Sequence, residues 1–253
     1  MISVQEDIGV TSSVLSPLLP KAVIPAITKT SSENKLYVQK NENGDITSFL
    51  SFFDGHCVFI KNGKPDYDEL AVFLNCKHCI SVTATEPEVL ENINCSFIKY
   101  PLLKKALPSE NEMCGEEVHY LSQKASSAVF KELYGLIYNS DLCFDVWYCD
   151  VAQRLNKGVL KAVYTVSAGK IVSCAFASAC YGNTALISGV VTKEKYKNRG
   201  LASRCINSLV NTLMTDGYTD IYLWCENELT AFYSKFGFEY YSDIYVGEYN
   251  GIL

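Results

Sequence analysis

One short basic stretch has the residue types and spacing for anion chemistry. It reads Tyr196-Lys197-Asn198-Arg199-Gly200-Leu201-Ala202-Ser203 and follows the apolar, strand-like run 185–191. The first turn of a helix has unpaired backbone N–H groups and the positive end of the helix dipole, and both attract anions. Gly200 and Ala202 leave room for a diphosphate to approach the backbone. The stretch predicts an anion site, although taken alone it is also typical of a plain strand-to-helix connection.

The charge around this stretch supports the anion site. The chain has 22 Lys and Arg against 28 Asp and Glu, which gives a net charge of −6. Basic side chains nevertheless crowd the segment 193–204, where Glu194 is the one acid; they are Lys193, Lys195, Lys197, Arg199 and Arg204. Such a local excess of positive charge in an acidic chain favours an anionic ligand at this place.

The residues after the stretch predict the elements that position it. Leu201, Cys205 and Leu209 recur every four residues and continue to Leu213, which is the apolar stripe of a helix that packs on a sheet. Gly217 ends this helix, and the apolar, aromatic run 221–225 reads as a buried strand. A strand, a helix and a strand in this order predict a parallel strand pair with a right-handed crossover.

The next segment, 226–238, predicts a second helix. Its apolar residues fall on one helical face and Gly237 ends it; they are Leu229, Phe232, Tyr233 and Phe236. A last strand is predicted from 239 to 241 and on to 246.

These residues carry a family resemblance. The run GVVTKEKYKNRGLAS (189–203) followed by ENELTAFYSKFGF (226–238) resembles the GCN5-related N-acetyltransferase (GNAT) superfamily. In the first run Lys197, Gly200 and Ala202 stand where that family's coenzyme A loop has Arg or Gln, Gly, and Gly or Ala. In the second run Glu226 stands at a position that is usually Asn, and Asn227 follows it. The close match covers 185–238, and a looser one begins near 116.

The resemblance implies an α/β (α+β) GNAT fold, a mixed and mostly antiparallel sheet with a splayed parallel strand pair, flanked by helices. It implies transfer of an acetyl group from acetyl-coenzyme A to a primary amine by direct attack in a ternary complex, with no metal. The implied coenzyme-binding residues are Val190, Val191, Thr192, Lys197, Asn198, Arg199, Gly200, Leu201, Ala202, Ser203 and Asn227.

The resemblance also implies catalytic roles. Tyr233 matches the phenol that donates a proton or a hydrogen bond to the departing thiolate. The identity of the base that accepts the proton of the amine is left open, because the strand 186–191 offers only Ser188 and no carboxylate. Glu226 is the first candidate for the base, with Asp145 and Asp150 behind it, and an amine that loses its proton to water needs none.

The amino-terminal half repeats the same order of elements without the loop. The runs 36–40 and 46–50 predict a hairpin, 57–60 a strand, 67–74 a helix that begins near Asp66, and 79–83 a further strand. The segment 61–65 ends in Pro65 and has no small-residue anion turn. We therefore predict two domains, a degenerate GNAT-like domain at 1–110 without a coenzyme A loop and a catalytic domain at 111–253, joined near 108–112.

The segment between the linker and the anion stretch predicts the rest of the second domain. The run 127–137 reads as an amphipathic helix, and Asp150 and Arg154 are spaced to pair on another helix. The runs 161–166 and 171–176 predict a hairpin. Residues 171–192 contain no charge, but their serines and the Gly182-Asn183 turn favour buried sheet over a membrane span.

Composition excludes several other classes. At 48% hydrophobic and 20% charged residues, the chain is typical of a globular protein. The start has no signal-peptide pattern, and the odd number of cysteines, 11, favours reduced thiols in a cytoplasm. The cluster Cys76-Lys77-His78-Cys79 lacks two further zinc ligands. A pI of 5.2 and the absence of a basic stripe argue against nucleic acid, and no membrane partner is expected.

Two alternatives to an N-acetyltransferase stay open. One is a non-catalytic acyl-coenzyme A-binding regulatory or interaction protein. The other is an aminoacyl or peptidyl transferase, which needs a large basic groove that the sequence does not suggest. The sequence leaves open the acceptor, a small-molecule or peptide amine, and the oligomeric state.

Overall fold

The computed structural model describes residues 1–4, 35–53, 55–106, 118–138 and 143–251. The chain forms two compact units. The first unit comprises Met1–Leu103, Trp224–Thr230 and Tyr240–Leu253, and the second comprises Lys104–Leu223 and Ala231–Glu239. The predicted linker 108–112 lies outside the described residues.

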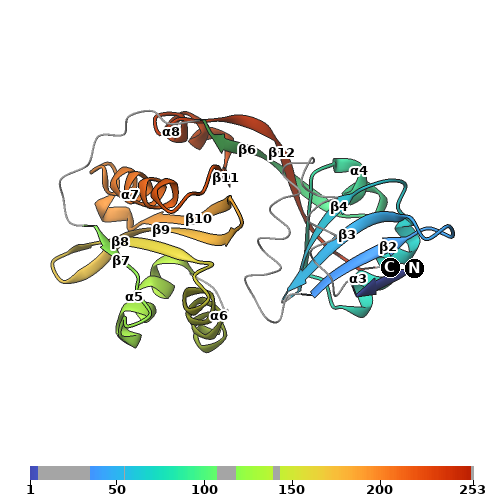
Figure 1. Cartoon of the computed structure of the whole chain (residues 1–253), viewed down its shortest axis with the longest axis horizontal. Coiled ribbons are helices and arrows are strands. Elements are labelled where there is room, and N and C mark those ends of the chain that lie inside the picture. The colour runs from blue at the N-terminus through green and yellow to red at the C-terminus, as the bar shows by residue number, and fades with distance from the viewer. Residues whose placement is uncertain (5–34, 54, 107–117, 139–142, 252–253) are drawn as a thin grey trace. The chain divides into compact units, whose positions relative to one another are not determined.

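In its described residues, the first unit is a small mixed sheet with the short helices α3 and α4 (Figure 1). Its strands neighbour one another in the order β1-β2-β3-β4-β5-β12, and only β4 and β5 are parallel. The elements are β1 (Ile2–Val4), β2 (Lys35–Lys40), β3 (Ile46–Phe53), β4 (His56–Lys61), α3 (Tyr67–Cys76), β5 (Ser81–Ala84), α4 (Pro87–Asn92), and most of β6 (Ser96–Lys105) and β12 (Phe238–Glu248).

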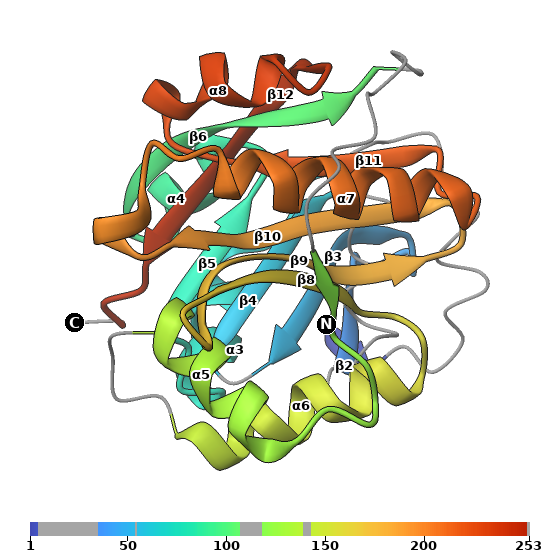
Figure 2. The same ribbon diagram turned by 90° about the vertical axis from the view of Figure 1, so that its left-hand side faces the viewer.

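The second unit is a sheet with helices on both faces. Its strands follow the order β7-β8-β9-β10-β11, and only β10 and β11 are parallel. Helix α7 lies on one side of this sheet, and α5 and α6 lie on the other (Figures 1 and 2). The elements are β7 (His119–Tyr120), α5 (Ser127–Ile137), α6 (Phe144–Asn156), β8 (Lys161–Ser167), β9 (Lys170–Tyr181), β10 (Thr184–Thr192), η1 (Glu194–Tyr196), α7 (Leu201–Thr215), β11 (Asp220–Trp224) and α8 (Thr230–Ser234).

The two units share one order of elements, as the sequence predicts. In each, a hairpin leads to an antiparallel third strand, a helix crosses over, and the next strand pairs in parallel. These elements are β2-β3-β4-α3-β5 in the first unit and β8-β9-β10-α7-β11 in the second. The fold is therefore a mixed α/β fold that occurs twice in the chain.

The end of the chain groups with the first unit, which differs from the predicted segments 1–110 and 111–253. The physical reason is strand pairing. The last part of β12 pairs antiparallel with β5, from Tyr245 with Ala84 to Glu248 with Ser81. Periodicity along a single strand does not reveal which sheet edge will accept it.

The predicted helix over 226–236 is shorter than the sequence suggests. The structure has a 3-10 turn, η2 (Asn227–Leu229), followed by the five-residue α8. The sequence predicts Leu229 on one helical face with Tyr233 and Phe236, but Leu229 is 41% exposed, whereas Tyr233 and Phe236 are buried. A 3-10 turn advances each residue by a larger angle than an α-helix does, so Leu229 leaves the apolar stripe.

The uncharged segment 171–192 forms most of β9 and all of β10, as predicted. Within the described parts of the chain, no helix combines the length and apolarity that a membrane span needs.

A network of side-chain hydrogen bonds surrounds the start of helix α3. The Asp66 carboxylate caps the helix by accepting a hydrogen bond of 3.0 Å from the Glu69 backbone N–H. Gln39, which is 1% exposed, donates to the Asp66 carbonyl and to the Glu69 carboxylate, each at 2.9 Å. Its amide oxygen accepts from the Asp66 N–H at 3.1 Å. The buried amide thus ties β2 to the start of α3.

We expect Gln39→Leu to destabilise the first unit by about 1–3 kcal/mol, because the Asp66 N–H loses its acceptor while it stays partly buried. Urea unfolding followed by circular dichroism measures this. The matched control is Lys40→Leu, which changes an exposed residue on the same strand. Equal midpoints for the two variants would show that the network contributes nothing to stability.

Candidate active site

The parallel pair β10–β11 separates before either strand ends. The two strands pair through Thr184 with Asp220, Ala185 with Ile221 and Leu186 with Tyr222, and no further. Strand β10 nevertheless continues to Thr192, with β9 and β11 as its neighbours in the strand order. The outer part of β10, 187–192, therefore presents an edge that is open on the β11 side, and the predicted splay of the parallel pair is present.

A β-bulge changes the direction of β10 within this open part. Ser188 pairs with Phe176 and Val191 with Cys174, so three steps on β10 face two steps on β9. Gly189 lies in the bulge with a φ of +56°, a conformation that glycine adopts without steric cost. This bulge was not predicted from the sequence, although a single glycine inside a strand pattern is the usual signal of a bulge.

A buried serine fastens the end of the open strand. The Ser173 hydroxyl donates to the Val191 carbonyl at 3.1 Å and lies 2.7 Å from the Thr192 hydroxyl. The Lys193 N–H donates to Val172 of β9 at 2.9 Å. Since successive N–H groups of a strand point to opposite sides, the Thr192 N–H points to the open side. Sequence reasoning missed Ser173, whose partners are remote in sequence.

The predicted anion turn has the backbone geometry of an anion site. Asn198 and Gly200 both have positive φ, +60° and +74°, and α7 begins at Leu201. The first backbone hydrogen bond of the helix runs from the Arg204 N–H to the Gly200 carbonyl. No described residue accepts a hydrogen bond from the backbone N–H groups of 198–203, and these residues are exposed or half-buried. An anion at this turn would find a set of free donors.

Some basic side chains of the turn pair with a carboxylate, and others lie over an aromatic ring. Lys197 pairs with Glu194 at 2.6 Å. Lys195 and Arg199 instead lie over the ring of Tyr196, with Nζ at 5.0 Å and Cζ at 5.3 Å from its centroid. Neither pairs with a carboxylate in the described part of the chain. Their positive charge therefore stays available.

Tyr233 lies inside the second unit. It is 7% exposed, and its ring makes edge contacts with Phe232 and Phe238, with centroids 5.1 and 6.3 Å apart. These contacts account for its burial as a core aromatic, so a role for its hydroxyl stays a prediction.

The candidate bases differ in their surroundings. Glu226 and Asn227 are exposed and belong to the first unit. Asp145 is exposed, whereas Asp150 forms the predicted ion pair with Arg154, with N–O distances of 3.0 Å. Asp150 is thus held by a guanidinium.

Two buried thiols of the second unit, Cys174 and Cys205, are unreactive at neutral pH. Burial raises the pKa of Cys174 to about 12 and that of Cys205 to about 11. Cys174 donates weakly to the Gly189 carbonyl at 3.6 Å. Both thiols stay protonated and serve as packing groups. No group of three potential metal ligands occurs among the residues that the structure describes.

Comparison with known proteins shows which proteins the chain is similar to. Residues 131–238 match the model of the acetyltransferase (GNAT) family. A GCN5-related N-acetyltransferase-like protein from Streptococcus suis has 15% identity and a TM-score of 0.65, over 95% of this chain and 97% of that one. A GCN5-related N-acetyltransferase from Kribbella flavida has 16% identity and a TM-score of 0.56, over 81% and 88%. Among curated proteins, no relative of this sequence was found.

A further solved structure resembles the whole chain. It is a tandem GNAT protein from the clavulanic acid biosynthesis pathway, with 9% identity and a TM-score of 0.66, over 100% of this chain and 99% of that one. Residues 131–238 therefore match the GNAT family model, and the fold of the whole chain resembles that of a tandem GNAT protein.

The turn gives a direct test. An added Cβ at Gly200 meets nothing within 4 Å, but a φ of +74° makes any other residue strained, at a cost of about 1–2 kcal/mol. We expect Gly200→Ala to leave the chain folded and to weaken coenzyme A binding by about tenfold or more, the equivalent of one lost charge-assisted hydrogen bond. Calorimetry measures the affinity.

Gly158→Ala is the matched control, because Gly158 has a φ of +70° in equally open space at the end of α6. It carries the same strain without facing the turn. Similar losses of affinity in both variants would show that strain, and not contact with the coenzyme, sets the effect.

Proposed function

We propose that the second unit is an acetyl-coenzyme A-dependent N-acetyltransferase that acts on a primary amine. The observation that supports this most is the run of free backbone N–H groups at 198–203 next to the open edge of β10. The two features suit the two ends of one ligand. The turn suits the diphosphate, and the edge suits the amides of the pantetheine arm, which can add to β10 as a strand would.

The reaction requires few groups. An N–H donor of 190–192 polarises the thioester carbonyl as the oxyanion develops. The amine nitrogen attacks the carbonyl carbon, the C–S bond breaks, and the products are an acetamide and coenzyme A. The amine loses one proton and the leaving thiolate gains one. We propose that Tyr233 donates to the thiolate and that Glu226, directly or through water, accepts from the amine.

The first unit is proposed to bind no coenzyme A. At the start of α3 the place of an anion is taken by the Asp66 carboxylate, with Asp68 and Glu69 in the first turn. Gln39 bonds the backbone N–H and carbonyl of the capping residue Asp66. Negative charge at a helix start repels a diphosphate where the second unit would attract it.

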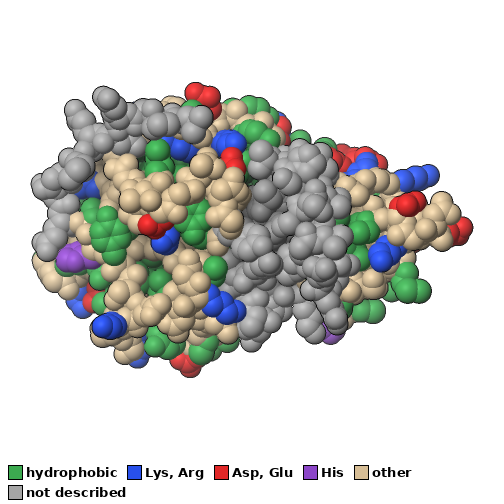
Figure 3. All heavy atoms as spheres, viewed as in Figure 1, with side chains coloured by type: hydrophobic (Ala, Val, Ile, Leu, Met, Phe, Trp, Pro, Cys, Tyr) green, Lys and Arg blue, Asp and Glu red, His purple; other side chains and the backbone are tan. Residues whose placement is uncertain are grey.

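Two other functions have less support. A regulator that only binds acyl-coenzyme A would need no Tyr233. An aminoacyl transferase would need an extended basic surface, and on the face drawn in Figure 3 the acidic and basic side chains of the described residues are interspersed. The described cysteines are all free thiols, which supports a reducing compartment such as the cytoplasm.

Tyr233→Phe tests the catalytic proposal, since it keeps the ring and removes the hydroxyl. General acids contribute about 10²–10⁴-fold, and we expect the low end because a thiol with a pKa near 8.5 leaves readily. The measurement is kcat in a thiol-release assay against a panel of amines, with unchanged coenzyme A affinity.

Tyr249→Phe is its control, since it removes a hydroxyl that bonds the Ala71 carbonyl at 2.9 Å in the first unit. Unchanged turnover in Tyr233→Phe would leave Tyr233 as a packing residue.

The stoichiometry of binding tests the assignment of the two units. We expect a calorimetric titration with coenzyme A to end at one equivalent per chain, because of the two crossover helices α7 begins without an acidic cap, whereas α3 begins with the capping carboxylate of Asp66 and an acidic first turn. Two equivalent sites would refute the proposal for the first unit.

A further inference from the structure

Tyr196 and the two cations on its ring form a feature that the proposed reaction does not explain. Tyr196 ends η1 and is half-buried. Lys195 and Arg199 lie over its ring at 5.0 and 5.3 Å from the centroid. An ammonium or guanidinium at this distance is attracted by the ring's negative face. The ring therefore restricts two side chains that would otherwise move freely in solvent.

The local ion pair increases the effect of this arrangement. Glu194 is the one acid in 193–204, and Lys197 holds it at 2.6 Å. The guanidinium of Arg199 thus keeps its N–H donors while its position is fixed by the ring. A planar guanidinium with free donors is suited to bind a phosphate monoester by two hydrogen bonds.

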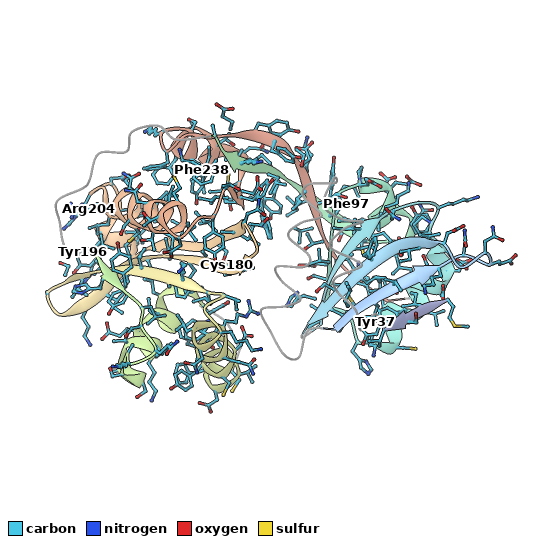
Figure 4. The ribbon with its side chains drawn as sticks, in the orientation of Figure 1. Tyr37, Phe97, Cys180, Tyr196, Arg204 and Phe238 are labelled. Atoms are coloured by element: carbon cyan, nitrogen blue, oxygen red, sulfur yellow. The ribbon has the colours of Figure 1, made fainter. Side chains whose placement is uncertain are left out.

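Two kinds of anion site lie together at the start of α7. One consists of the backbone N–H groups of 198–203, and the other of the Arg199 and Lys195 side chains on Tyr196. Figure 4 shows Tyr196 and Arg204 on the same side of the second unit. Coenzyme A carries two separate phosphate groups, a diphosphate and a ribose 3′-phosphate, so it offers one anion to each site.

We propose that Tyr196 is a positioning residue that holds Arg199, with Lys195, for the 3′-phosphate of coenzyme A. The turn binds the diphosphate, and the cations on Tyr196 select the phosphorylated coenzyme over 3′-dephospho-coenzyme A. This inference rests on the proposed function and adds to it a determinant of donor specificity.

The test is a calorimetric comparison of coenzyme A and 3′-dephospho-coenzyme A. We expect the unaltered chain to prefer coenzyme A. Tyr196→Leu should weaken coenzyme A binding by about two- to fivefold, the size of an exposed cation–π contact, without changing the affinity for the dephospho form. Tyr196→Phe keeps the ring face and should retain the preference. Arg199→Gln should weaken coenzyme A binding by about tenfold or more and abolish the preference.

Lys124→Gln controls for the loss of one positive charge, because Lys124 is exposed in a turn before α5 and lies outside the basic stretch 193–204. Equal losses for both ligands in Tyr196→Leu and Arg199→Gln would overturn the inference, since the cations would then serve the diphosphate. Unchanged affinities in both variants would overturn it as well. If the unaltered chain bound neither ligand, the proposed function itself would fail. Arg199 is exposed, so its variant gives a result even if Tyr196→Leu does not fold.

Discussion

The early end of the pairing between β10 and β11 is the constraint on which the candidate site depends. Three residue pairs hold the strands in parallel, up to Leu186 and Tyr222. Beyond them, a bulge at Gly189 turns β10, and β9 alone supports it. A strand edge without a partner is normally a liability. Here the Ser173 hydroxyl fastens the end of β10 and keeps the edge ordered, so the edge can accept a ligand in the manner of a strand.

The start of the crossover helix distinguishes the two units. The same order of strands and helix occurs in both, so topology alone does not create the site. In the second unit, left-handed residues at Asn198 and Gly200 expose the first N–H groups of α7. In the first unit, α3 follows Pro65 and is capped by the Asp66 carboxylate, and Gln39 accepts a hydrogen bond from the Asp66 N–H. A difference of a few residues at one junction thus separates an anion site from a helix start that is capped by an acidic side chain.

Local patterns were enough to predict most elements. The helix over 127–137 has the predicted bounds, α3 begins next to Asp66 as predicted, and the parallel pairs follow from the strand-helix-strand order. The helix predicted after 226 differs, and Leu229 is exposed because a 3-10 turn replaces the first part of it. The partner of β12 was not predicted, because β5 lies far away in sequence.

The candidate site was only partly predictable for the same reason. The sequence identifies the turn 197–203, since backbone donors at a helix start follow from local residue types. It does not reveal the hydrogen bonds of Ser173 or the cations on Tyr196, which depend on side-chain positions. The roles of Tyr233 and Glu226 stay proposals. Packing in the core is enough to explain the position of Tyr233, and Glu226 is an exposed side chain.

Amide hydrogen exchange with and without coenzyme A tests the central claim most directly, because it reports on backbone N–H groups one segment at a time. If the turn and the open edge bind the coenzyme, peptides that cover 187–205 will exchange more slowly when it is present. Peptides that cover 61–75, at the start of α3, will not change. Protection at 61–75, or no protection at 187–205 under saturating coenzyme A, would contradict the account.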